Sequence, residues 1–338
     1  MSIALVTGAT GLVGSHIVDL LLDQGWTVRA LARQPTVARD ELPPRVEVVQ
    51  GDVLDEHSFV RAAAGCHTVF HSAADVITRG GWEAYRATNI DGTRNAVAAA
   101  ERAGARLLQV SSVAVYGSAS RYDAAGAGGR TDEFTPMAPL SERAYYGRSK
   151  RESEQLVLDA HRQGRVWAAA VRPCVVYGRR DRQFVPRMAR VLRRRLLPLL
   201  NGGRSVFGVV HAANVASGCI LAATTDAAGG NAYNLANDFD ITVRRFFELA
   251  GEALDARPLF VPVPVGVARV ALRSAKRVMR ALGGERFNLV SVSTVDFIAE
   301  DNPFSSDRAK RELGWRPTVR HEDGVPDAFR WWAAARAG

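Results

Sequence analysis

The sequence predicts an α/β protein with a doubly wound parallel sheet, and two patterns indicate it. Short apolar runs rich in strand formers alternate with longer segments whose apolar residues recur every three or four positions. A stretch with three glycines follows the first of these runs. Because a connection between parallel strands has to cross over the sheet, strands that alternate with helices indicate parallel βαβ units.

The alternation is regular through the first half of the chain. Predicted strands cover residues 3–7, 27–31, 46–49, 68–71, 107–111 and 168–171; predicted helices begin at residue 12 and cover 56–64, 82–103 and 146–163. After Arg172 the pattern becomes irregular, with many prolines and glycines. Residues 117–136 include few large apolar side chains, and we expect them to form a mobile surface loop beside the site.

Gly8, Gly11 and Gly14 stand between the first predicted strand and the first predicted helix. Without β-carbons they permit a tight turn, close packing of helix on sheet, and the approach of backbone N–H groups to a pyrophosphate. Glycine spacing alone is a weak signal, but this position favours dinucleotide binding over a purely structural turn. The predicted contacts come from Gly8, Thr10, Gly11, Leu12 and Val13.

The sequence therefore predicts two regions. Residues 1–172 form a Rossmann-type dinucleotide-binding domain that includes the helix starting at Tyr146. Residues 173–338 form a smaller, mainly substrate-binding α/β region, from which some segments return to the first sheet.

The second predicted strand ends in Leu31-Ala32-Arg33, where the adenosine ribose would lie, and carries no carboxylate. A carboxylate there hydrogen-bonds a ribose 2′-hydroxyl, whereas a guanidinium suits a 2′-phosphate. We therefore predict NADP(H) rather than NAD(H), although Arg33 could instead stack on the adenine or point to solvent. Asp52 and Val53, after the third strand, are candidates for the adenine site, but an aspartate that caps its own loop gives the same pattern.

Tyr146 and Lys150 begin a predicted helix four residues apart, which puts the phenol and the ammonium on one helix face. A nearby cation favours the phenolate, so we expect Lys150 to tune the pKa of Tyr146 towards neutral pH for general acid or base catalysis. Tyr145 has Ser149 four residues on and lacks such a partner. The same spacing occurs on surface helices, but its place after the fifth strand of a glycine-loop fold favours catalysis.

A third group has to hydrogen-bond the substrate oxygen, where charge changes during hydride transfer. Ser111 and Ser112 both follow the fifth predicted strand, at the carboxyl edge where open α/β sheets carry their sites. The residues alone leave both serines open.

Composition excludes several classes of protein. Of the 338 residues, 47% are hydrophobic and 23% charged, which is close to globular usage, and no apolar run approaches the roughly 18 residues of a membrane-spanning helix. The chain begins directly in a strand, so a cytoplasmic protein is expected. Cys66, Cys174 and Cys219 are widely spaced among apolar residues, which predicts buried side chains rather than a disulfide or metal site.

A net charge of +9 could attract an anionic cofactor, acidic lipid or nucleic acid. The densest basic cluster, residues 193–195, is predicted to be the solvated face of a helix after Met188, so no nucleic-acid partner is expected. Residues 265–282 have the pattern of an amphipathic helix with a basic stripe. Such a helix can lie on an acidic membrane or admit an acyl substrate, but more often it packs one face and solvates the other.

Together these motifs resemble the extended short-chain dehydrogenase/reductases over nearly the whole chain. Further motifs of that family are His71-Ser72-Ala73-Ala74, Asn89-Ile90-Asp91-Gly92-Thr93, Ser112 four residues before Tyr116, Arg172-Pro173-x-x-Val176-Tyr177-Gly178, and the Ala-Lys-Arg-Glu-Leu-Gly-Trp-Arg-Pro run at 309–317. The resemblance implies Ser112 as the catalytic partner of Tyr146 and Lys150, with Asn89 in support. Homodimers are common in this family, so a homodimer is possible here. The resemblance also implies cofactor contacts from Ser72, Ala73, Ala74, Tyr146, Lys150, Pro173, Val175 and Val176.

Within the family the chain is most similar to the 3β-hydroxysteroid dehydrogenase-like branch, which includes bacterial reductases of lipid-derived 3-keto acids. Nucleotide-sugar members commonly carry a diphosphate-binding asparagine where this chain has Val175. Epimerases that retain NAD usually keep an acidic residue where it has Ala32. The stretch after His211 lacks the aspartate often found there, so no role is carried onto that histidine.

The expected function is the NADP(H)-dependent interconversion of a ketone and a secondary alcohol on a hydrophobic, steroid-like or acyl-derived substrate. In this scheme Tyr146 supplies the proton, Ser112 polarises the carbonyl and Lys150 also holds the nicotinamide ribose. Two alternatives stay open: a nucleotide-sugar epimerase or dehydratase, and a non-catalytic NADP(H)-sensing protein.

Overall fold

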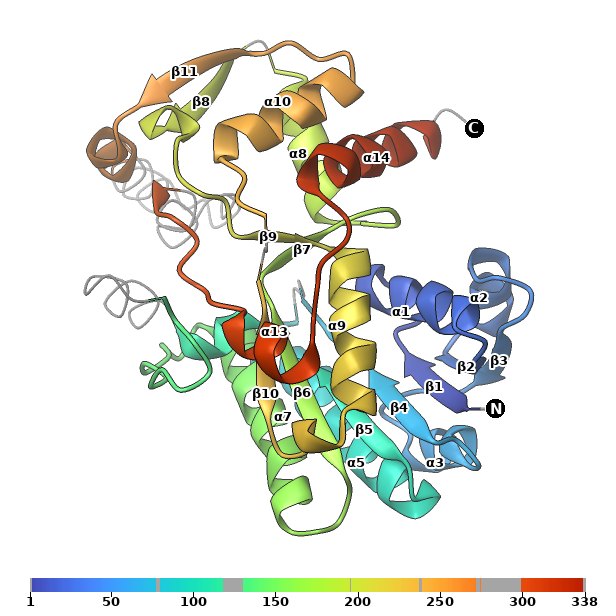
Figure 1. Ribbon diagram of the computed structural model, residues 1–338. Coiled ribbons are helices and arrows are strands. Elements are labelled where there is room, and N and C mark those ends of the chain that lie inside the picture. Colours follow the sequence, from blue (N-terminus) through green and yellow to red (C-terminus); the bar gives the residue numbers. More distant parts are fainter. Residues whose placement is uncertain are drawn as a thin grey trace. The chain divides into compact units, whose positions relative to one another are not determined.

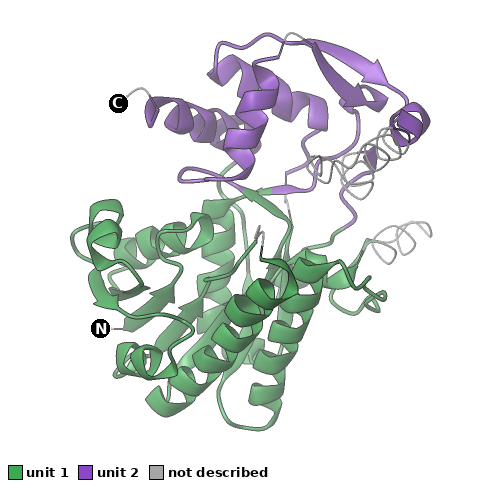
Figure 2. Cartoon of the chain, turned by 180° about the vertical axis from the view of Figure 1, so that it is seen from behind, with its two compact units in different colours: residues 1–176, 210–238, 304–319 green, residues 177–209, 239–303, 320–338 purple. Residues whose placement is uncertain are grey.

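The computed structural model describes residues 2–76, 80–117, 130–194, 196–236, 239–271, 274 and 299–336. Parts of two predicted segments lie outside the described residues: 118–129 of the predicted loop, and 272, 273 and 275–282 of the amphipathic helix. Figure 2 shows the two compact units of the chain. Unit 1 comprises residues 1–176, 210–238 and 304–319, and unit 2 comprises residues 177–209, 239–303 and 320–338.

Unit 1 is built on a seven-stranded sheet in the order β10-β6-β5-β4-β1-β2-β3, in which all neighbours are parallel (Figure 1). The strands are β1 (Ile3–Thr7), β2 (Thr27–Ala32), β3 (Glu47–Gln50), β4 (Thr68–His71), β5 (Arg106–Val110), β6 (Ala168–Pro173) and β10 (Ala232–Leu235). The predicted doubly wound α/β fold is confirmed. The strand order reverses between β1 and β4, and open α/β sheets bind ligands at such a switch point.

Helices cover both faces of this sheet, which explains why its strands are apolar along almost their whole length. On one face, α1 (Leu12–Asp23) and α9 (Ala212–Thr224) pack through residues such as Ile17 and Cys219. On the other, α3 (Glu56–Ala63), α5 (Gly92–Ala103) and α7 (Tyr145–Arg162) pack through residues such as Phe59 and Val157. The short helix α2 (Pro35–Glu41) follows β2. Cys66, Cys174 and Cys219 are all buried, as predicted.

The helix predicted over residues 82–103 is interrupted. It consists of α4 (Gly81–Tyr85), a π-helical turn (Arg86–Asp91) and α5 (Gly92–Ala103). A π-helical turn inserts an extra residue into an α-helix and often marks a functional site. Asn89 lies in this turn and is buried.

Two further segments differ from the sequence-based expectations. Thr131, near the end of the predicted mobile loop, is fully buried, forms a bridge with Phe304 and accepts a hydrogen bond from the Asn234 side chain at 3.3 Å. The described end of that loop is therefore anchored to unit 1.

The basic cluster at 193–195 was predicted to lie on a helix, but in unit 2 the helix α8 (Phe184–Leu192) ends before it. Arg193 is the C-cap of α8, and Arg195 lies outside the described residues.

Unit 2 has a core of aromatic side chains. Helices α8, α10 (Val243–Ala253) and α14 (His321–Ala334) pack around the fully buried Phe246, which contacts Phe184, Phe207 and Phe329. A parallel pair, β8 (Leu196–Leu200) and β11 (Leu259–Val263), belongs to the same unit. The remaining named elements are β7 (Val175–Tyr177), β9 (Val209–His211), α13 (Asp307–Leu313) and the 3₁₀ turns Val113–Tyr116, Asn201–Gly203 and Asp226–Ala228.

Candidate active site

The glycine stretch forms a tight turn directly after β1. Gly8 has a φ of +64°, in the left-handed region, and the N–H of Gly11 donates to the Gly8 carbonyl at 2.9 Å. A β-carbon on Gly8 would lie 2.8 Å from the Ala73 nitrogen, and one on Gly14 would lie 2.2 Å from the Gly8 carbonyl oxygen. The backbone of the turn, the start of α1 and the segment after β4 are therefore too close for side chains at these positions.

The start of α1 has the features of an anion-binding site. Its N-cap, Gly11, has extended backbone and no side chain to cap the first N–H groups, and the first turn carries no acidic residue. These N–H groups, at the positive end of the helix dipole, suit a negatively charged ligand. The turn thus fits a dinucleotide pyrophosphate, with Thr10, Leu12 and Val13 beside it.

The residues predicted for the adenosine end follow β2 and β3. Arg33 is exposed immediately after β2, and the Gly51 N–H donates to the Ala32 carbonyl at 3.1 Å, joining the ends of the two strands. One carboxylate oxygen of Asp52 accepts from the Leu54 N–H at 3.0 Å, which is the loop-capping role weighed above. The Val53 carbonyl accepts from the Asn95 side chain at 2.8 Å.

Tyr146 lies in the first turn of α7, half-buried, and the Ser112 hydroxyl is near enough to its phenol to influence its pKa. Burial raises the pKa of Tyr146; the Ser112 hydroxyl opposes this shift, and the neighbouring phenol of Tyr85 reinforces it. The sequence-based expectation that Lys150 brings this pKa down is therefore not met in the structure. The phenol stays protonated at neutral pH, which suits a proton donor.

Lys150 is buried one turn further along α7, where its Nζ donates to the Val110 carbonyl at the end of β5 at 2.8 Å. Burial lowers its pKa to about 8, and the Glu154 carboxylate partly counteracts that shift. The lysine is thus mostly charged at neutral pH but desolvated.

Replacing Lys150 by methionine is expected to raise the free energy of unfolding at pH 7 by about 3 kcal/mol. The folded-state pKa, about 8, lies below the ordinary 10.5, so the buried charge costs stability below pH 8, and the cost disappears as the pH rises to 10.5. Denaturant unfolding at pH 7 and pH 10 measures this difference. A variant less stable than wild type at pH 7, or a gain that does not shrink at pH 10, contradicts the expectation.

The structure distinguishes the two serines after β5. The Ser112 oxygen accepts from the Ala114 N–H at 3.2 Å and faces the Tyr146 phenol. Ser111 is 2% exposed, and its hydroxyl has no hydrogen-bond partner among the described residues. Only Ser112 is placed beside Tyr146.

Asn89 links the π-helical turn to α7. Its side-chain oxygen accepts from the Asp75 N–H at 2.7 Å, and its amide nitrogen donates to the Asp75 carbonyl and to the Ser149 hydroxyl, both at 2.9 Å. The Ser149 hydroxyl in turn donates to the Tyr146 carbonyl at 2.9 Å. Asn89 thus holds the segment after β4 and the first turn of α7 together.

Sequence reasoning gave no role to three residues that support this site. The Tyr85 ring lies edge-on to the Tyr146 ring, with centroids 6.4 Å apart. Glu154 and Arg172 form a buried ion pair with contacts of 2.6 to 3.1 Å, and Arg172 also donates to the Tyr116 hydroxyl at 2.8 Å. The position of Glu154, four residues after Lys150, was the available signal, because it puts the carboxylate one turn away on the same face.

The remaining residues predicted to contact the cofactor lie at the ends of strands. Pro173, Val175 and Val176 lie where β6 ends and β7 begins, and Ser72, Ala73 and Ala74 directly follow β4.

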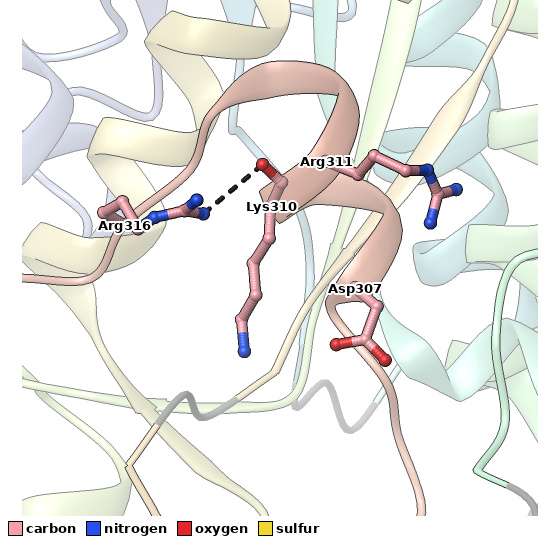
Figure 3. Close-up of a pocket in the computed structure, with 4 residues that line it drawn as sticks. All are labelled: Asp307, Lys310, Arg311 and Arg316. Carbon is pink, nitrogen blue, oxygen red and sulfur yellow. Dashed lines mark hydrogen bonds between the residues drawn. The ribbon is translucent and has the colours of Figure 1, made fainter.

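The motif at 309–317 has a structural explanation, because Trp315 is fully buried and donates to the Asn214 carbonyl at 3.0 Å. A recess beside α13 is lined by Asp307, Lys310, Arg311 and Arg316. Their side chains diverge rather than converge on one point (Figure 3), so we assign this recess no role.

The glycine turn at the start of a parallel sheet, together with a tyrosine and a lysine one helical turn apart, defines an NAD(P)-dependent oxidoreductase of CH–OH and C=O groups. A model of the NAD dependent epimerase/dehydratase family matches residues 4–236. The chain belongs to this family, and within it to the 3β-hydroxysteroid dehydrogenase-like branch of the extended short-chain dehydrogenase/reductases.

Individual relatives match nearly the whole chain. A 4-hydroxy-2-methyl-3-oxo-4-farnesyl-3,4-dihydroquinoline-1-oxide ketoreductase of Stigmatella aurantiaca is 30% identical over 96% of this chain and 95% of its own. A 3β-hydroxysteroid dehydrogenase/Δ5→4-isomerase of Mycobacterium tuberculosis is 28% identical over 98% and 90%. The crystal structure of gox2253 superposes with a TM-score of 0.79, at 29% identity over 99% of both chains. Among the described residues, no helix combines the length and hydropathy needed to cross a bilayer.

Proposed function

We propose that this protein is an NADP(H)-dependent ketoreductase that converts a ketone on a hydrophobic substrate into a secondary alcohol. The observation that carries the proposal is the placement of Ser112 beside Tyr146, whose phenol has a pKa that is raised rather than lowered. A protonated phenol can donate to a developing alkoxide, and a serine hydroxyl beside it can polarise the carbonyl.

The residues divide the work as follows. Hydride transfer to the carbonyl carbon is the chemistry that a bound nicotinamide supplies. Tyr146 donates the proton to the carbonyl oxygen, and Ser112 hydrogen-bonds the same oxygen. Lys150 would hold the nicotinamide ribose, while the ion pair of Glu154 and Arg172 fixes the helix behind it.

The preference for NADP(H) rests on Arg33 and on the absence of a carboxylate at Ala32. We expect Arg33→Ala to weaken NADPH binding about 30-fold and to leave NADH binding unchanged, because only the 2′-phosphate loses a charge-assisted contact. Fluorescence titration of each cofactor measures both dissociation constants. Arg39→Ala on α2 is the matched control, since Arg39 is also exposed. Tighter NADH than NADPH binding in the wild type refutes the preference.

The substrate class rests on the relatives and on Val175. The two relatives described above are named for a farnesylated quinoline oxide and for steroids, both largely apolar molecules. A nucleotide-sugar substrate would need a polar partner for its diphosphate, and Val175 offers none.

The test is NADPH oxidation followed at 340 nm with 3-oxo acyl and 3-oxosteroid ketones, next to an assay for epimerisation of UDP-sugars. Turnover of a ketone in the first assay supports the proposal. Epimerisation together with copurified NAD would establish the sugar-nucleotide alternative. Tight NADPH binding without turnover of any ketone would indicate the non-catalytic sensor.

A further inference from the structure

A row of buried side chains runs beneath the site, from the glycine turn to the π-helical turn. The Thr7 hydroxyl lies 2.9 Å from Nδ1 of His71, and Nε2 of His71 lies 3.2 Å from the Thr93 hydroxyl. All three residues are at most 2% exposed. Neither the proposed chemistry nor the family motifs assigned a role to this row.

The available protons fix the direction of every hydrogen bond in the row. The Thr93 hydroxyl donates its one proton to the Asn89 carbonyl at 2.7 Å, so it can only accept from His71, and Nε2 must carry a proton. At the other end, the Thr7 oxygen accepts from the Ala73 N–H at 3.2 Å. Its own proton is then free for Nδ1, which has to be the unprotonated acceptor in a neutral ring.

The two ends of the row touch the two halves of the site. The Ala73 nitrogen lies 2.8 Å from the place that a β-carbon on Gly8 would occupy, so Ala73 limits the position of the glycine turn. Asn89 holds Asp75 and Ser149, and through Ser149 the first turn of α7. His71 is thus the middle of a continuous path from the phosphate-binding turn to the helix that carries Tyr146.

We propose that His71 is a positioning residue whose neutral Nε2–H ring couples the glycine turn to the π-helical turn, so that a change at Thr93 alters dinucleotide binding. Burial lowers the pKa of His71 to about 3, and the charge of Lys150 acts in the same direction. The ring therefore remains neutral and keeps one donor and one acceptor under ordinary conditions.

The first test changes the end of the row that is remote from the dinucleotide. Thr93 lies on α5, and Thr93→Val keeps the side-chain shape but removes the hydroxyl. We expect its Kd for NADPH, measured by fluorescence titration, to rise three- to tenfold, roughly the loss of one buried hydrogen bond. Thr93→Ser restores the hydroxyl and should restore wild-type affinity.

Thr68→Val is the matched control, because Thr68 is a buried threonine on β4, the strand that ends in His71, but lies outside the row. It should bind NADPH as the wild type does, even if its unfolding temperature falls as far as that of Thr93→Val. Wild-type NADPH affinity in Thr93→Val, or equal losses of affinity in both valine variants, would overturn the proposal. NADPH affinity is independent of the ketone, so this result does not depend on whether the proposed reaction is correct.

The second test observes the wild-type ring directly and needs no variant to fold. Long-range ¹H–¹⁵N NMR spectra of protein labelled in its histidines distinguish the two neutral tautomers and the cation. We expect His71, assigned by its absence in His71→Gln, to be the neutral Nε2–H form between pH 5 and pH 8. If Nδ1 carries a proton in that pH range, the deduced directions of the hydrogen bonds are wrong and the proposed coupling is ruled out.

Discussion

Replacing Tyr146 by phenylalanine is expected to lower kcat for ketone reduction by a factor of about 10³, within the range of proton transfer from a positioned side chain. The variant keeps the ring that packs against Tyr85 and loses only the hydroxyl beside Ser112. Without that hydroxyl the developing alkoxide loses its proposed proton donor. Steady-state NADPH oxidation with a ketone that the wild type reduces measures the loss.

Tyr145→Phe is the matched control for this experiment. Tyr145 also has its ring in the aromatic cluster, 6.3 Å from Trp82 and 6.4 Å from Tyr85, but no lysine follows it at four residues. We expect its kcat within threefold of the wild type. NADPH binding by Tyr146→Phe should change little, which separates a chemical defect from a misfolded site. If Tyr146→Phe retains turnover within tenfold of the wild type, the assignment of the proton donor is wrong.

The fold was predictable because local patterns and global topology agree in this chain. The first six strands of the central sheet lie within two residues of their predicted positions, since apolar runs between helical segments allow little freedom of register. The strand at 232–235 was not placed, because a four-residue run after an irregular stretch carries no periodic signal and its pairing with β6 depends on tertiary contacts.

The site was predictable where chemistry requires a residue type at a fixed spacing. The glycine turn and the pair Tyr146 and Lys150 belong to this class. The direction of the Tyr146 pKa shift was not predictable, because it depends on how deeply α7 buries the phenol and on Tyr85, which comes from another helix. Likewise, the role of Asn89 depends on a π-helical turn that hydrophobic spacing cannot distinguish from a continuous helix.

Several buried polar groups gather around this site. Lys150, His71, Asn89 and the pair of Glu154 and Arg172 are each less than 5% exposed and lie below or beside the predicted nicotinamide position. Burying a charge or an amide costs stability, and the hydrogen bonds described above reduce that cost for all five residues. The site is therefore held by a fixed network, as preorganised electrostatic stabilisation requires.

Gly14→Ala is expected to raise the Kd for NADPH at least about 100-fold, which corresponds to about 2.7 kcal/mol. The added β-carbon would lie 2.2 Å from the Gly8 carbonyl oxygen and 2.9 Å from the Ser72 hydroxyl oxygen. The first contact is with backbone, so relief requires α1 to move away from the turn. That movement separates the first N–H groups of α1 from the Gly8 turn, and both are needed to surround a pyrophosphate.

Gly266→Ala provides the comparison, because a β-carbon on Gly266 meets nothing within 4 Å. We expect this variant to bind NADPH with wild-type affinity. Circular dichroism should show that Gly14→Ala keeps its secondary structure, since the sheet and α9 hold α1 through the apolar face that contains Ile17. A folded Gly14→Ala protein that binds NADPH within threefold of the wild type would show that the pyrophosphate does not lie over this turn, and the glycine spacing would then be a packing requirement of α1 on the sheet.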